Sequence, residues 1–377
     1  MVAQKWRTSF SNVVVFVVST CLMLVVSELV LRLFYPQQLG VWHQTRDGLA
    51  IHRPNSRIKY LGHEVLINSL GMRDREHSIK KKDGTFRILL LGDSFMEALQ
   101  VPFDESFPKL LEDRLRESGS QNVEVINVAV SGWGTEDELA YLVRYGKRLE
   151  PDLVLVAMTL HNDVSDNLRE QFYTLNDSRL LPKPIQQTPT VEYWSIRLKG
   201  FVASHFHIFQ LWRKYWYRAA IQTTGLQLNN HVKNLLFGGD ASGMARGWQL
   251  TFQEMAAIQG EGKAIGAKTA VMLIPLALQL SSEQFVSEAT NRAGSRQEVI
   301  GRGWEPQTRM IKFGKTQGIE IVDLLPAFAE WKTTHNASLY LEQDGHWNAA
   351  GHKLAASHVA SELLRMRLLQ TSHDHNQ

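Results

Sequence analysis

The stretch "RILLLGDSFMEAL", residues 87–99, decides how most of this chain folds. A continuous run of apolar residues stops at Gly92-Asp93-Ser94. A short, uninterrupted apolar run is typical of a strand that is buried on both faces. Two interpretations of Ser94 compete at the end of such a strand. Its hydroxyl either caps the helix that follows or acts as a nucleophile, and a nucleophile requires partner residues elsewhere in the chain.

From residue 86 onward, strand patterns alternate with helix patterns. The expected strands cover residues 86–92, 123–130, 152–160, 267–275 and 319–325, and the expected helices cover 105–118, 135–150, 298–317 and 349–369. Strands that alternate with helices form a parallel sheet with helices on both of its faces. The sequence therefore predicts an α/β fold.

The first 35 residues differ from the rest. No charged residue occurs from Thr8 to Ser27, a stretch of 20 residues, which is near the ~20 residues that cross a bilayer. Lys5 and Arg7 place the N-terminus in the cytoplasm and the rest of the chain outside it, in the periplasm or beyond. Because no A-x-A cleavage site follows, we expect an uncleaved anchor of the inner membrane that contacts lipid through residues 8–34. A buried core helix is the alternative.

The chain divides by pattern into an anchor, a lead-in, a main domain and a tail. Their ranges are 1–35, 36–84, 85–370 and 371–377, and the lead-in contains one expected strand within residues 63–74. An insertion at about 166–245 interrupts the main domain, and its residues 191–220 are rich in aromatic and basic side chains. These helices either pack their aromatic side chains on the main domain, or form a cap that binds sugar rings or rests against the membrane surface.

Composition excludes several classes of protein. A net charge of +3 gives no reason to expect nucleic acid as a partner. The single cysteine, Cys21, excludes an internal disulfide and a site built from several cysteines. The sequence does not indicate an oligomeric state.

Polar residues follow three of the expected strands, and a histidine comes late in the chain. Ser94 follows the first strand, Gly132 the second and Asn162 the third, whereas Asp344 and His346 precede the last helix. Parallel strands bring their carboxyl ends to one edge, where ligands bind. A serine nucleophile needs a base, a group that orients the base, and donors for an oxyanion. The backbone N–H groups of Ser94 and Gly132 and the amide of Asn162 are the candidate donors.

Four blocks, "LLLGDSF", "NVAVSGWGT", "TLHND" and "DGHWNAAGH", resemble those of the SGNH (GDSL-type) hydrolases over about residues 86–365, without the insertion. The resemblance implies a flavodoxin-like three-layer α/β/α sandwich and an enzyme that hydrolyses or transfers acyl esters without a cofactor. It also implies that Ser94 is the nucleophile, His346 the general base, and Gly132 and Asn162 oxyanion donors.

The third member of the triad departs from the family spacing. The family places an aspartate three residues before the histidine, where this chain has Gln343. Asp344 lies two residues before His346, in an Asp-x-His-Trp form that resembles a branch that O-acetylates or deacetylates exported bacterial polysaccharides. We therefore assign the orienting role to Asp344, with Glu342 or a Ser-His dyad as alternatives. Two other acids, Asp93 and Asp163, are expected to brace their loops.

The main hypothesis for function is a membrane-anchored serine esterase that acts outside the cytoplasmic membrane on O-acyl groups, with acylated glycans as candidate substrates. An O-acyltransferase would use the same site and pass the acyl group to a sugar hydroxyl. A non-catalytic glycan-binding or assembly subunit is the alternative of another class.

Overall fold

The computed structural model describes residues 2–37, 39–119, 122–160, 162–184, 189–216, 244–280, 305–342 and 345–370. The chain divides into two compact units. The smaller unit combines Met1–Trp42 with Pro189–Gly225, and the larger combines His43–Thr188 with Leu226–Gln377. Each unit is described by itself.

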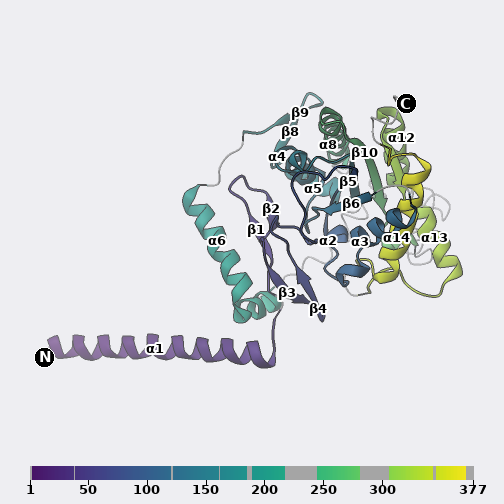
Figure 1. The fold of residues 1–377 in the computed structure, drawn as a ribbon. Coiled ribbons are helices and arrows are strands. Elements are labelled where there is room, and N and C mark those ends of the chain that lie inside the picture. The colour runs from purple at the N-terminus through teal and green to yellow at the C-terminus, as the bar shows by residue number, and fades with distance from the viewer. Residues whose placement is uncertain are drawn as a thin grey trace, which may run out of the picture. The chain divides into compact units, whose positions relative to one another are not determined.

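Five parallel strands form the central sheet of the larger unit (Figure 1). They are β5 (Thr85–Gly92), β6 (Asn122–Asn127), β7 (Leu153–Thr159), β10 (Lys268–Ile274) and β11 (Glu320–Asp323). The order across the sheet is β11-β10-β7-β5-β6. After β5 the chain builds outward on one side through β6, and then crosses to the other side through β7. This is the doubly wound, flavodoxin-like order, whose switch point lies between β5 and β7.

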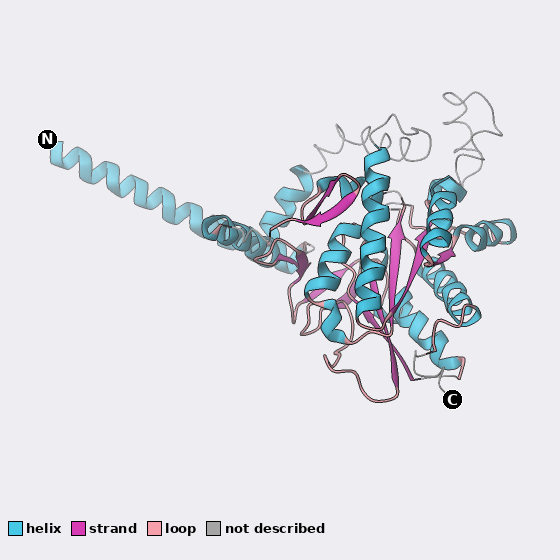
Figure 2. Cartoon of the chain, turned by 90° about the horizontal axis from the view of Figure 1, so that it is seen from above, coloured by secondary structure: helices cyan, strands magenta, loops and turns pink. Residues whose placement is uncertain are grey.

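Helices cover both faces of this sheet, so the unit has three layers (Figure 2). On one face lie α3 (Phe107–Glu117), α13 (Leu325–Thr334) and α14 (Ala349–Arg365). On the other lie α4 (Thr135–Arg144), α8 (Met244–Ala264) and α12 (Glu305–Gln317). The predicted fold class is confirmed, and all five expected strands are present.

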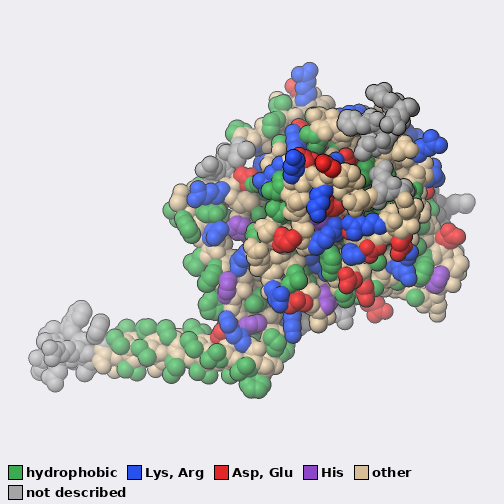
Figure 3. Space-filling view, viewed as in Figure 1, with side chains coloured by type: hydrophobic (Ala, Val, Ile, Leu, Met, Phe, Trp, Pro, Cys, Tyr) green, Lys and Arg blue, Asp and Glu red, His purple; other side chains and the backbone are tan. Residues whose placement is uncertain are grey.

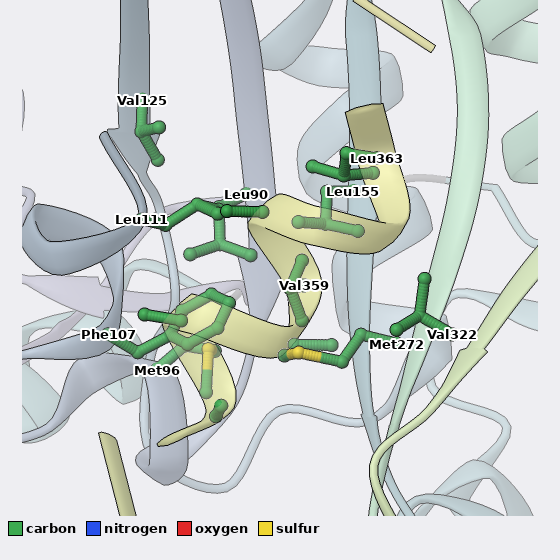
Figure 4. Close-up of a cluster of buried hydrophobic side chains, with 14 of the residues drawn as sticks. Leu90, Met96, Phe107, Leu111, Val125, Leu155, Met272, Val322, Val359 and Leu363 are labelled. Carbon is green, nitrogen blue, oxygen red and sulfur yellow. The ribbon is translucent and has the colours of Figure 1, made fainter. Parts of the chain in front are cut away.

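The hydrophobic core on the α14 face explains why the central strands β5 and β7 are mostly apolar. Leu90 and Leu155 of adjacent strands meet Phe107 and Leu111 of α3 and Val359 of α14 (Figure 4). Strands buried on both faces are apolar at nearly every position. Arg87 of β5 is a charged residue within this sheet, and its guanidinium donates to Glu124 Oε2 on β6 at 2.7 Å.

Short elements complete the larger unit. Antiparallel pairs join β1 (Trp42–Gln44) to β2 (Ala50–His52), β3 (Arg57–Tyr60) to β4 (His63–Leu66), and β8 (Tyr173–Asn176) to β9 (Arg179–Pro182). Short helices are α2 (Ser94–Glu97), α5 (Asp163–Asp166), α9 (Ala277–Leu280), η1 (Phe103–Glu105), η2 (Gly146–Leu149) and η3 (Asn167–Arg169). The lead-in therefore contains more than the one strand that the sequence predicts.

The smaller unit is helical. It contains α1 (Val2–Phe34), α6 (Thr190–His205) and a helical segment at 207–216. Within α1, the 24 residues Ser11–Phe34 are long and apolar enough to cross a membrane. Their apolar side chains are exposed along the helix (Figure 3).

Candidate active site

Ser94 sits at a sharp transition from strand to helix. It is the first residue of α2, directly after β5. The N-cap of this helix is Asp93, whose carboxylate accepts from Phe95 N–H at 3.0 Å. The helix-cap interpretation of Ser94 is therefore wrong, and the expectation that Asp93 braces the turn is confirmed. The Ser94 hydroxyl is left to face the carboxyl edge of the sheet.

His346 lies against Ser94. Its Nε2 is 2.8 Å from Ser94 Oγ, which is hydrogen-bonding distance, and the two residues are 252 positions apart in sequence. The imidazole also packs on Phe95, with 4.9 Å between ring centroids. A nucleophile and a base within this distance match the geometry that activates a serine hydroxyl. The structure thus brings together the two residues that the sequence places at the centre of the site.

The motif around His346 explains how its position is fixed. Trp347 is fully buried and packs on Phe95 and Phe328, with ring centroids 5.2 Å and 5.4 Å away. Its backbone forms a bridge with Tyr340. Asn348 then caps α14 by accepting from Gly351 N–H at 3.1 Å. A buried aromatic anchor and a helix cap therefore flank the histidine on its C-terminal side.

The orienting acid is not decided by the described residues. Asp344, the predicted partner of His346, lies outside them together with Gln343. The alternative, Glu342, is exposed. The assignment of Asp344 to this role stays a prediction.

Asn162 is tied directly to the turn that carries Ser94. Its Nδ2 donates to Asp93 Oδ2 at 3.1 Å. Because an amide nitrogen carries two hydrogens, Nδ2 can donate to Asp93 and to a substrate oxygen at once. Asp93 is buried, and burial raises the pKa of its carboxyl, against the hydrogen bonds from Phe95 and Asn162. Its position between Ser94 and Asn162 joins the ends of β5 and β7.

Gly132 occupies the loop after β6 and has a φ of +81°. A positive φ is available to glycine at little cost, because glycine has no Cβ. Its carbonyl accepts from Arg169 Nη2 at 3.0 Å. The loop can therefore present backbone N–H groups beside the sheet edge, and the role of Gly132 as an oxyanion donor stays a prediction.

The expectation that Asp163 braces its loop is confirmed. Its carboxylate accepts from Thr159 N–H at 2.8 Å, which closes the turn between β7 and α5. Burial, and next the charge of Asp93, raise the pKa of Asp163 well above its ordinary value. The same two causes raise the pKa of Glu138. Of these two buried acids, Asp163 supports the turn after β7.

Sequence reasoning missed a polar chain behind the nucleophile turn. The carboxylate of Glu97, at the end of α2, accepts from the Ser131 hydroxyl and contacts His52 Nε2. Glu97 and His52 are fully buried, and His52 Nδ1 lies 3.2 Å from Gly71 O. We call Glu97, His52 and Ser131 the Glu97 network. It links the lead-in, the helix that begins at Ser94 and the residue before Gly132.

Arg73 of the lead-in completes the support of this helix. Its guanidinium donates to Glu97 O at 2.9 Å, and to Ala98 O and Val101 O. These carbonyls lie at the end of α2, where helical partners are missing. Burial lowers the pKa of Arg73 to about 10, although the nearby acids Glu97 and Asp74 oppose this change. A search for motifs could not find these residues, because each is a single polar residue in an unremarkable context.

Among the described residues, no group of three or more His, Cys, Asp or Glu side chains is arranged to hold a metal ion. The described groups that can take part in chemistry at the site are Ser94, His346 and nearby hydrogen-bond donors. A serine and a histidine joined by a hydrogen bond, at the carboxyl edge of a doubly wound parallel sheet, define a site of the serine-nucleophile class.

Part of the chain is similar to a known protein family. Residues 240–376 match a family model described as an SGNH hydrolase-like domain, acetyltransferase AlgX. This match contains the block with His346, one of the four blocks that resemble the SGNH (GDSL-type) hydrolases.

A curated arylesterase of Vibrio mimicus is 35% identical over 100 residues, which are 24% of this chain and 50% of that protein. The match therefore spans about half the length of that arylesterase. Solved structures that are similar include a catalytic mutant of the acetylxylan esterase Axe2 from Geobacillus stearothermophilus. It has 13% identity and a TM-score of 0.41, over 74% of this chain and 94% of that one. The psychrotrophic esterase EstA from Pseudoalteromonas sp. has 15% identity and a TM-score of 0.38, over 76% and 99%.

Proposed function

We propose that this protein is a membrane-anchored serine esterase that cleaves O-acyl groups, with O-acetyl groups on cell-surface or exported glycans as substrates. The observation that carries the proposal is the 2.8 Å contact between Ser94 Oγ and His346 Nε2. The anchor is α1, whose charge-free residues 8–27 match the thickness of a bilayer core. Lys5 and Arg7 keep its start in the cytoplasm, so the site faces the outside of the inner membrane.

In the first half of the reaction, Ser94 Oγ attacks the ester carbonyl carbon and its proton passes to His346 Nε2. The carbonyl oxygen becomes an oxyanion, which accepts hydrogen bonds from the backbone N–H groups of Ser94 and Gly132 and from Asn162 Nδ2. His346 then gives the proton to the departing sugar oxygen, and the acyl group stays on Ser94. Asp344 holds the histidine in the tautomer that this exchange needs.

In the second half, water attacks the acyl-enzyme while His346 accepts its proton. The bond to Ser94 Oγ breaks, the proton returns to that oxygen, and the carboxylic acid leaves. The product and the free serine close the cycle without a cofactor.

A second candidate function is O-acyl transfer to a sugar hydroxyl. It is favoured by one observation, which is that the matched family model is described as an acetyltransferase. A sugar hydroxyl would replace water in the second half of the same mechanism. Ser94 and His346 would then keep their roles.

One experiment separates the two functions. The purified full-length chain is given an activated acetyl ester, with and without an oligosaccharide that has free hydroxyl groups. The acetyl group is then followed by mass spectrometry. Free acetate in both reactions supports the esterase. Acetylated sugar without free acetate contradicts it and supports the transferase.

The same assay tests whether Ser94 is the nucleophile. Ser94→Ala should lower turnover by about a thousandfold or more, because the acyl-enzyme cannot form. Ser361→Ala is the matched control, since the Ser361 hydroxyl only donates to Ser357 O on the surface of α14. If the wild type turns over the ester no faster than Ser94→Ala does, and a serine-directed phosphonate fails to label it, the protein is a non-catalytic binding or assembly subunit.

A further inference from the structure

An apolar stripe runs along one side of α6, and its side chains are exposed in the part of the chain that the structure describes. Val191, Trp194, Leu198 and Phe201 are spaced by three or four residues and are 49–84% exposed. This spacing places all four on one face of a helix. Arg197 and Lys199 point about 100° to either side of Leu198, so basic side chains flank the stripe.

The helical segment 207–216 carries a second exposed aromatic face. Trp212, Tyr215 and Trp216 are 56–67% exposed and again lie on one side of the helix. Arg213 and Lys214 stand between them in sequence. We call the two faces together the aromatic face. Exposed apolar surface of this kind marks a site of contact with a protein or a membrane.

Two charged residues of α1 hold both helices. The Glu28 carboxylate accepts from His207 N–H and Ile208 N–H, each at 3.0 Å, at the start of the 207–216 segment. The first N–H groups of a helix have no partner inside it, so the carboxylate satisfies them and stabilises the helix dipole. Arg32 donates to Glu28 at 2.8 Å and to His205 O, at the end of α6, at 2.6 Å.

This attachment fixes where along α1 the aromatic face begins. Glu28 directly follows the charge-free residues 8–27, which rise by about 30 Å in a helix. A segment of that length fills the hydrocarbon core, so Glu28 and Arg32 lie where the core meets the lipid head groups. Trp and Tyr prefer this depth, and Lys and Arg there meet anionic head groups.

We propose that the aromatic face is a second membrane-contact surface, which lies flat in the outer head-group layer of the bilayer that α1 spans. The occupant is phospholipid, because the face continues the exposed apolar surface of α1 through the contacts of Glu28 and Arg32. The inference rests on the membrane anchoring in the proposed function and adds an interfacial helix pair to it. Helices that lie in this layer carry Trp, Phe and Leu on one side and basic residues on the other.

The test measures the depth of single spin labels in the full chain, reconstituted in vesicles of phosphatidylethanolamine and phosphatidylglycerol. In a Cys21→Ser background, labels are placed by Leu198→Cys and Trp212→Cys on the aromatic face, and by Glu192→Cys on the other side of α6. The native Cys21, which lies within the span, labels the anchor itself. Collisions with oxygen report lipid and collisions with a water-soluble nickel complex report water.

We expect the labels at 198 and 212 to collide more with oxygen than with nickel, as the label at 21 does, and the label at 192 to show the reverse. Water exposure at 198 and 212 with lipid exposure at 21 overturns this inference and leaves the anchoring intact. Water exposure of the label at 21 overturns both the membrane-contact inference and the proposed anchoring. Spectral broadening at 198 and 212 that disappears on dilution with unlabelled protein overturns it in favour of a second copy of this chain.

A further variant tests the attachment. Glu28→Ala removes the acceptor for His207 and Ile208, and we expect the label at 212 to shift toward water while the label at 21 stays in lipid. An unchanged depth at 212 contradicts the role given to Glu28. Arg309→Ala, on α12 of the larger unit, is the control for loss of an ion pair that does not involve α1.

Discussion

Gly92 shows why the nucleophile turn needs a residue without a side chain. A Cβ at this position would lie 2.8 Å from Met96 Cγ and 3.2 Å from Ala157 Cβ, both of which are buried. We expect Gly92→Ala to lower the free energy of unfolding by about 1–3 kcal/mol, because the core must shift to admit a methyl group. Chemical denaturation measures the change.

Gly260→Ala is the matched control. This glycine lies inside α8, and its Cβ would meet nothing within 4 Å. Alanine forms helix better than glycine by about 1 kcal/mol, so this variant should be as stable as the wild type or more so. Equal losses in both variants would contradict the packing argument.

The Glu97 network makes a prediction about positioning. Glu97→Ala leaves the Ser131 hydroxyl and His52 Nε2 without their shared acceptor, in a buried site. We expect a loss of about 2–5 kcal/mol in the free energy of unfolding. Because Ser131 precedes Gly132, we also expect kcat to fall by a larger factor than KM rises, at a temperature where the variant is folded.

Glu117→Ala, which breaks an exposed pair with Arg114, is the control and should change the free energy of unfolding by less than about 1 kcal/mol. A Glu97 variant that unfolds more easily but keeps wild-type kcat would show that the network supports the fold without positioning the Gly132 loop.

Residues of the site differ in how far the sequence could reveal them. Ser94, Asn162 and His346 were found because each stands at a strand end or before a helix, in a motif whose chemistry is coherent. Glu97 and His52 carry no such signal, since their partners come from segments that are far apart in sequence. The contact between Glu97 and His52 exists only in the folded chain, so the sequence alone does not indicate it.

At the scale of elements, the buried strands were predictable because a short uninterrupted apolar run in an α/β protein indicates a strand that is covered on both faces. The helix α8 was missed because glycines at 247, 260 and 262 weaken its pattern. Two of them lie where the helix packs closely: a Cβ at Gly262 would be 2.9 Å from Thr269 Oγ1, and one at Gly247 would be 3.1 Å from Val164 Cγ1. These two glycines are required by packing against residues that are distant in sequence. A local sequence pattern does not show that packing.

One expected helix, 135–150, is interrupted. The structure ends α4 at Arg144 and continues with η2 from Gly146 to Leu149. A Cβ at Gly146 would lie 3.0 Å from Leu89 Cδ2, so the chain turns close against β5. The expected helix at 298–317 begins at Glu305 in the described residues, and its first part lies outside them.

The side chain of His77 links the lead-in to the central sheet, and its protonation state changes with pH. His77 lies 2.7 Å from Glu124 on β6 and 3.0 Å from Asp74. Burial opposes its protonation, but hydrogen bonds to Asp74 and Glu124 outweigh this effect and raise the pKa of His77 to about 9. The ordinary pKa of histidine is about 6.5, so the folded state binds the proton more tightly than the unfolded state.

This difference predicts how stability changes with pH. The contribution of protonated His77 is complete below pH ~6.5 and is lost as the pH rises through ~9. We expect the free energy of unfolding of the wild type to fall across this range, and His77→Gln to fall less steeply. Denaturation series at several pH values measure both slopes, with His358→Gln on α14 as the control. Parallel slopes in the wild type and His77→Gln would contradict the assignment.

At the scale of the whole molecule, the proposed topology rests on the charged residues at the start of α1. Lys5 and Arg7 precede the span, and the proposal places everything after it outside the cytoplasm. Protease added to intact spheroplasts should digest the chain beyond residue 35 and spare a tag at the N-terminus. Changing Lys5 and Arg7 to Glu should reduce the fraction of chain that is digested. The same change at Lys80 and Lys81, which lie far beyond the span, should leave that fraction unchanged. Protection of the larger unit in the wild type would refute this topology.

The distance in sequence between Ser94 and His346 has a consequence for synthesis. Translation proceeds at about 5–20 residues per second, so the 252 residues between them separate the two side chains by roughly 10–50 seconds. The span emerges first, the nucleophile follows, and the base arrives only with the last strand and helix of the sheet. A nascent chain that ends before His346 therefore carries its serine without a base. Under the proposed function, products truncated before His346 lack the base and should be inert toward esters.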